Sequence, residues 1–144
     1  MTISEFWDYI LSIENEYAVF RKQIMRKFSL SAAETDIIMF LANNPCFDTA
    51  AHISKMKKMP KSQVSLAVNS LCRKGLLEGV YSEGNRKSIH LKLKENADPI
   101  IAYGKKVQGE FSKLLFSDFT ESERAEFSRL HSKIAENIKA KKED

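Results

Sequence analysis

The hydrophobic period of the chain changes near Gly75, and this change restricts the fold more than any other feature of the sequence. Before it, two short helices are predicted. Asp48 or Thr49 can cap the first, which runs to about Met56, and Pro60 suits the first turn of the second, where its missing N–H is no loss. The second helix has an apolar inner face made of Val64, Ala67, Val68 and Leu71. Glycine readily adopts the left-handed conformation that ends a helix.

Two strands are predicted after the second helix, over residues 76–81 and 89–93. In the second strand apolar and polar residues alternate: Ile89, Leu91 and Leu93 against His90 and Lys92. Residues 82–87 contain the Gly and Asn that a hairpin turn needs. Helix, turn, helix and hairpin predict a winged helix-turn-helix, mainly α with a small two- or three-stranded β wing (α+β).

Long amphipathic helices are predicted on both sides of this segment. An apolar stripe runs from Ile3 to Lys27, and another follows Pro99. Ser31–Glu34 and Thr120–Glu123 are capping boxes, in which a hydroxyl and a carboxylate satisfy backbone N–H groups at the start of a helix. The outer stripes are longer than one short neighbouring helix would cover, which indicates pairing with a second copy of the chain; a monomer core is the alternative.

The basic residues gather in the central segment. The formal net charge is +4, but residues 49–92 hold nine Lys and Arg against two Glu, so the rest of the chain is slightly acidic. This asymmetry is typical of a module that binds a polyanion such as nucleic acid, although a solvated basic face is the alternative.

The second short helix is narrow enough for the major groove of double-stranded DNA, where its N-terminal residues would meet base edges. Gln63 can hydrogen-bond adenine through both ends of its amide, and Lys61 is a long cation beside a helix N-terminus that favours phosphate. Ser62 and Ser65 can reach bases or phosphates, and Asn69 lies four residues beyond Ser65 on the same face.

The hairpin tip is predicted to place cations against an adjacent minor groove. This prediction rests on Asn85, Arg86 and Lys87, for which a solvated turn is the alternative. Further contacts with the DNA backbone are predicted at Thr49, Lys57 and Lys58.

Five stretches of the sequence form a pattern that is shared with a known family. They are TAAHIS at 49–54, PKSQVS at 60–65, LCRKGLL at 71–77, and residues 84–93 and 119–123. The first three resemble the helix-turn-helix of the MarR family of bacterial transcription regulators, the fourth resembles its wing, and the last resembles the start of its final helix. The resemblance covers nearly the whole chain. It departs from the family at two places: the wing has one Arg86 with Lys87 instead of paired arginines, and Leu66 stands where the family often has an arginine.

The resemblance implies one MarR-like domain over 1–144, with dimerisation helices at 1–27 and 96–144 and a DNA-binding lobe at 28–95. It implies a homodimer on a pseudo-palindromic operator, with repression as the default and a small-molecule or oxidative signal releasing the DNA. The expected dimerisation residues are Ile3, Trp7, Ile10, Phe111, Phe127, Leu130 and Ile134. Family analogy suggests an effector pocket near Tyr17, Phe40 and Phe47, although core packing is the alternative.

Other kinds of site have little support in the sequence. No cofactor or metal is expected, because the two cysteines lack CxxC spacing and the three histidines are scattered; Cys72 is interpreted as a buried structural thiol. No enzyme motif is recognisable. No apolar run approaches the roughly 20 residues that span a bilayer, and acidic residues interrupt the N-terminus, so a cytoplasmic protein is expected. A winged helix that binds a protein partner instead of DNA stays open as the alternative function.

Overall fold

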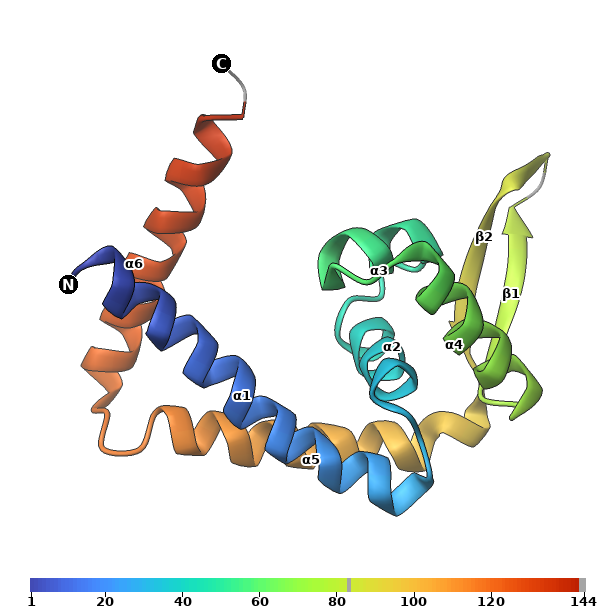
Figure 1. Ribbon diagram of the computed structural model, residues 1–144, viewed down its shortest axis with the longest axis horizontal. Helices are drawn as coiled ribbons and strands as arrows, with labels where there is room; N and C mark the ends of the chain where they lie inside the picture. The colour runs from blue at the N-terminus through green and yellow to red at the C-terminus, as the bar shows by residue number, and fades with distance from the viewer. Residues whose placement is uncertain (83, 143–144) are drawn as a thin grey trace. The chain divides into compact units, whose positions relative to one another are not determined.

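The computed structural model describes residues 1–82 and 84–142, and the side chains of residues 82 and 85–88 lie outside this description. It divides into two compact units, Met1–Gly109 and Glu110–Asp144. The described elements, in chain order (Figure 1), are α1 (Ile3–Phe28), α2 (Ala32–Asn43), α3 (Ala50–Lys57), α4 (Lys61–Arg73), β1 (Leu77–Ser82), β2 (Asn85–Leu93), the 3-10 helix η1 (Glu95–Ala97), α5 (Asp98–Leu115) and α6 (Glu121–Ala140). The predicted fold class, mainly α with a small β wing, is confirmed.

Capping boxes begin three of the helices. The hydroxyls of Ser31 and Thr120 each accept a hydrogen bond from the backbone N–H three residues on, as predicted for α2 and α6. Thr2 and Glu5 form a third box at the start of α1. This third box was not predicted, although its residue pattern is the same as in the other two.

A core between α2, α3, α4 and the hairpin holds the central lobe together. Fully or almost fully buried side chains converge on it from each element: Ile37 and Ile38 of α2, Ile53 of α3, Val64, Ala67 and Leu71 of α4, Leu77 of β1 and Leu91 of β2. The predicted inner face of α4 is therefore confirmed, with Val68 only half-buried at its margin. In Figure 1 the hairpin runs beside α4.

The hairpin differs from its prediction in length. β1 and β2 pair antiparallel from Leu77 opposite Leu93 to Tyr81 opposite Ile89, and β2 begins at Asn85, earlier than the predicted start at Ile89. The predicted turn over 82–87 was too long, because pairing continues past the alternating apolar residues. Of the predicted two- or three-stranded wing, the described residues form two strands, and an isolated bridge between Thr49 and His90 stands in place of a third.

A glycine lets α5 approach α1 and α2 closely within the first unit. A Cβ atom on Gly104 would collide with the side chain of Met39 and lie 3.5 Å from Cδ1 of Ile24, and both of these side chains are buried. Nearby, Gln108 of α5 donates a hydrogen bond of 2.9 Å to the hydroxyl of Tyr17 of α1. The first half of α5 is therefore anchored to the base of the lobe through both apolar and polar contacts.

The second unit has a small aromatic cluster of its own. Phe116, Phe119 and Phe127 meet edge to face, with ring centroids 5.4 to 6.3 Å apart. His131 stacks on Phe127, and the guanidinium of Arg124 lies over the ring of Phe116. These contacts join the end of α5 to the start of α6.

Candidate nucleic-acid interface

The outer face of α4 presents every residue predicted to read DNA from this helix. The side chains of Lys61, Ser62, Gln63, Ser65 and Asn69 are all exposed, while the opposite face of the helix is buried in the core. Arg73, exposed at the end of the same outer face, was missed; its place four residues beyond Asn69 was the available signal.

The start of α4 differs from the starts of its capped neighbours. The helix begins at Lys61 with Pro60 in the N-cap position, so Pro60 lies one position earlier than predicted. Pro60 makes no side-chain capping hydrogen bond, unlike Thr49 at α3 or Ser31 at α2. The first-turn N–H groups of α4 therefore lack a side-chain cap among the described residues, which suits them to an anionic oxygen such as a phosphate.

The turn between α3 and α4 is held by local hydrogen bonds. The hydroxyl of Ser54 donates to the carbonyl oxygen of Met59 at 2.7 Å, and Lys58 adopts a left-handed conformation with a φ of 51°. Lys57, the last residue of α3, and Lys58 are both exposed. The two lysines predicted to meet the DNA backbone thus lie in the connection that leads into α4.

Thr49, the third predicted backbone contact, is the N-cap of α3. Its Oγ1 accepts a hydrogen bond from the N–H of His52 at 3.2 Å, and its side chain is half-buried. Asp48, the alternative predicted cap, does not cap α3. Its carboxylate accepts a hydrogen bond of 2.8 Å from Nδ1 of His90, and its carbonyl oxygen accepts one from the N–H of Leu91. Asp48 therefore links the loop before α3 to β2.

The predicted wing contacts lie in β2. The backbone of Asn85, Arg86 and Lys87 belongs to the strand, so the prediction that they form the hairpin tip was wrong. Their side chains lie outside the described part of the chain.

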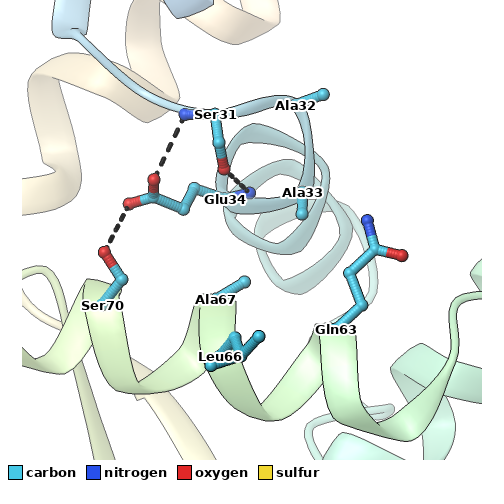
Figure 2. Close-up of a pocket in the computed structure, with 8 residues that line it drawn as sticks. All are labelled: Ser31, Ala32, Ala33, Glu34, Gln63, Leu66, Ala67 and Ser70. Carbon is cyan, nitrogen blue, oxygen red and sulfur yellow. Dashed lines mark hydrogen bonds between the residues drawn. The ribbon is translucent and has the colours of Figure 1, made fainter.

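A buried carboxylate joins α2 to the end of α4. Glu34 is 6% exposed, and its Oε2 accepts a hydrogen bond of 2.7 Å from Nζ of Lys74 and one of 3.3 Å from the hydroxyl of Ser70. Its other oxygen accepts from the N–H of Ser31 at 3.2 Å (Figure 2). Burial raises the pKa of Glu34, but the hydrogen bond and charge of Lys74 and the bonds to Ser31 outweigh burial, so the pKa is lowered overall.

This pair changes the charge of the central segment. Lys74 was counted among the nine cations of residues 49–92, but it forms an ion pair with Glu34, which lies outside that segment. The charge expected to face DNA is therefore smaller than the sequence suggested.

A second carboxylate joins α1 to α2. Asp36 accepts a hydrogen bond of 2.7 Å from Nη1 of Arg21. Burial raises the pKa of Asp36 above its ordinary value, and the opposing charges of Arg21 and Lys57 do not fully offset it. The contribution of this group to stability is therefore present at low pH and lost as the pH rises through its folded-state pKa, the reverse of Glu34.

Comparisons with known proteins identify the fold. Residues 28–88, which include α2, α3, α4 and most of the hairpin, match the family model described as MarR family. Residues 28–88 therefore form a winged helix that is similar to that of the MarR family. Comparison with curated protein sequences gives no match.

Three solved structures show how far the similarity extends. A MarR transcriptional regulator from Methanosarcina mazei Go1 has a TM-score of 0.77 at 18% identity, with 95% of this chain and 91% of that chain covered. FabT from Streptococcus pneumoniae, in complex with DNA, has a TM-score of 0.71 at 22% identity, with 96% of this chain and 99% of that chain covered. A MarR-family regulator from Listeria monocytogenes, complexed with 26mer DNA, has a TM-score of 0.75 at 14% identity, with 96% of this chain and 89% of that chain covered. The MarR fold thus extends beyond the matched segment to the flanking helices.

The residues predicted to line an effector pocket of this MarR fold have different surroundings. Phe40 is buried in the core of the lobe, and Tyr17 is half-buried with its hydroxyl bonded to Gln108. Phe47 is exposed and meets the ring of His52 edge to face at 5.3 Å. The effector pocket stays a prediction.

The predicted dimerisation residues are of two kinds. Ile3, Trp7, Leu130 and Ile134 are exposed, while Ile10, Phe111 and Phe127 are half-buried. Phe127 belongs to the aromatic cluster of the second unit, where it packs α6 against Phe116 and Phe119.

The two cysteines are both exposed, so the interpretation of Cys72 as a buried thiol was wrong. The apolar inner face of α4 does not include its position. Within residues 1–82 and 84–142 no group of three or more His, Cys, Asp or Glu could hold a metal ion. None of the helices described is long and apolar enough to cross a membrane.

Proposed function

We propose that this protein is a DNA-binding transcription regulator, with α4 as the helix that enters the major groove. The observation that carries the proposal is the outer face of α4, where five exposed polar side chains follow a helix start that has no side-chain cap. Polar side chains at this end can hydrogen-bond base edges, and the first-turn N–H groups can bind a phosphate.

The neighbouring structures support this proposal. FabT and the Listeria regulator were both solved with DNA, and both share the fold over at least 96% of this chain. In this chain Lys57 and Lys58 precede α4 as exposed cations, and we assign them with Thr49 to the DNA backbone. Asn85, Arg86 and Lys87 of β2 are assigned to the adjacent minor groove.

We further propose a homodimer that represses transcription from a pseudo-palindromic operator, with residues 28–95 as the DNA-binding lobe and 1–27 and 96–144 as the dimerisation helices. Exposed apolar residues on α6 support this part: Leu130, Ile134 and Ile138 are spaced by four residues and are 46 to 59% exposed. Trp7 on α1 is 62% exposed. Apolar side chains so arranged on helices are typical of a surface that a second copy covers. An effector that releases DNA belongs to the same proposal.

Selection of bound fragments from random double-stranded DNA tests this function. We expect enrichment of an inverted repeat whose half-sites are centred about 10 base pairs apart, or a multiple of that spacing, because two symmetric copies of α4 would reach successive major grooves. The affinity of the selected site should fall steeply as salt rises, since phosphate contacts release counterions. If no sequence is enriched at low salt, the DNA-binding function is wrong and a winged helix that binds a protein partner is favoured.

Charge placed on the exposed stripe of α6 should separate the copies. We expect the Leu130→Glu, Ile134→Glu double variant to sediment as a monomer where the wild type sediments as a dimer, because four carboxylates would be buried together in a symmetric contact. Analytical ultracentrifugation at micromolar concentration measures this.

The matched control is Ser128→Glu with Ser132→Glu, which adds the same charge at the same spacing on another face of α6, where both serines are exposed. It should remain dimeric. A dimer in both variants would remove α6 from the proposed interface.

A further inference from the structure

One apolar side chain stands on the outer face of the proposed reading helix. Leu66 is 72% exposed, although three of its neighbours in α4, Val64, Ala67 and Leu71, are buried. Ser62, Leu66, Asn69 and Arg73 are separated by four, three and four residues, so they share one face, and that face points away from the core. Leu66 therefore lies in the middle of the surface assigned to DNA.

The neighbours of Leu66 on that face are shorter or polar. Ser62 and Ser65 have small side chains, so the leucine projects beyond them from the helix surface. Leu66 also forms part of the rim of a groove between α2 and α4, beside Gln63 (Figure 2). With α4 in the major groove of DNA, the isobutyl group of Leu66 would meet the floor of that groove together with the amide of Gln63.

An apolar group pressed against base edges selects among them. Most groups on the floor of the major groove are hydrogen-bond donors or acceptors, and covering them with leucine leaves them without water or another partner. The thymine 5-methyl group is the apolar group of the four bases in this groove. Contact between Leu66 and a methyl group would remove apolar surface of both from water.

We infer that Leu66 is a specificity residue that reads the 5-methyl group of a thymine in each operator half-site. This inference rests on the proposed function and adds to it the identity of one recognised base. Leu66 stands where the MarR family often has an arginine, which could bind a phosphate. In this chain the lost phosphate contact would be offset by a contact that depends on the DNA sequence.

Replacing thymine by deoxyuridine in the selected operator tests the inference, because it removes only the 5-methyl group. Each thymine of a half-site is replaced in turn, and binding is measured by fluorescence anisotropy at constant salt. For the wild type we expect one position at which the substitution weakens binding about fourfold, and about fifteenfold when both half-sites are changed, as burial of a single carbon group predicts.

The variants assign that effect to Leu66. Leu66→Ala should bind the thymine and deoxyuridine operators equally, whereas Leu66→Met, which keeps an apolar side chain of similar length, should retain the sensitivity. Ser65→Ala, on the same helix, is the control that should also retain it. Because Leu66 is largely exposed, circular dichroism and thermal unfolding should show that Leu66→Ala is folded.

Two results would overturn the inference while leaving the proposed function intact: no thymine position at which wild-type binding depends on the methyl group, or equal dependence in the wild type and Leu66→Ala. Failure to select any DNA sequence would overturn the proposed function, and the reading of thymine with it. Retention of a specific operator by the wild type therefore distinguishes the two failures.

Discussion

Replacing Lys61, Gln63 and Arg86 together with alanine is expected to weaken binding to the selected operator by at least about 100-fold. A bidentate contact from glutamine to adenine contributes about 1–3 kcal/mol of discrimination, and each lost cation removes a phosphate contact. The plot of the logarithm of the binding constant against that of the salt concentration should also become less steep, by roughly 1.8 for each protomer, because two cations are removed. Fluorescence anisotropy over a series of salt concentrations measures both effects.

The control removes the same charge from a different part of the chain. Lys105 and Lys106 are exposed on α5, and the double variant Lys105→Ala, Lys106→Ala should bind the operator within about threefold of the wild type, since screening weakens charges that are remote from the DNA. If the triple variant and this control lost equal affinity, net charge alone would account for binding, and α4 would not be the reading helix.

The second large effect is expected at Glu34. We expect Glu34→Ala to lower the free energy of unfolding by about 2–3 kcal/mol, because it removes the capping box of α2 together with charge-assisted hydrogen bonds to Lys74 and Ser70. The side chain of Lys74 is 40% exposed and can be hydrated once its partner is gone, which keeps the cost below that of a fully buried broken pair. Urea unfolding followed by circular dichroism measures the change.

Glu34→Gln separates the charge from the cap, because glutamine can also complete a capping box. It should cost about half as much at neutral pH. The pKa of Glu34 is lowered from its ordinary value of 4.5, so the stability that its charge contributes is present above that value and lost as the pH falls through the folded-state pKa. The difference between wild type and Glu34→Gln should therefore shrink in acid; a difference that stayed constant from pH 7 to pH 3 would contradict the role assigned to the charge.

Several elements of residues 28–95, and the start of α6, could be predicted because their signals are local. The capping boxes at Ser31 and Thr120, the four apolar residues of α4 and the left-handed Gly75 each depend on residues a few positions apart, and each lies where the sequence placed it. The errors were at boundaries. β2 begins before its alternating apolar pattern, because backbone pairing does not require apolar side chains.

The exposed face of α4 could be predicted from the sequence, since periodicity determines which side of a helix faces away from the core. Exposure was harder to predict for single residues. Cys72 is exposed, contrary to its prediction as a buried thiol. At Leu66 the sequence indicates only the loss of a charge, whereas the structure has an exposed apolar group in the middle of the proposed reading face.

By itself the sequence determined the order of the elements, the polar face of α4 and the basic character of the central segment, because these follow from spacing and composition. The tertiary structure alone decided the pairings between distant residues. Glu34 meets Lys74 across 40 positions, Asp48 meets His90 across 42, and Gly104 is required where α5 approaches Met39. Such contacts depend on how helices pack in three dimensions, and no local pattern encodes which charge will be buried beside which partner.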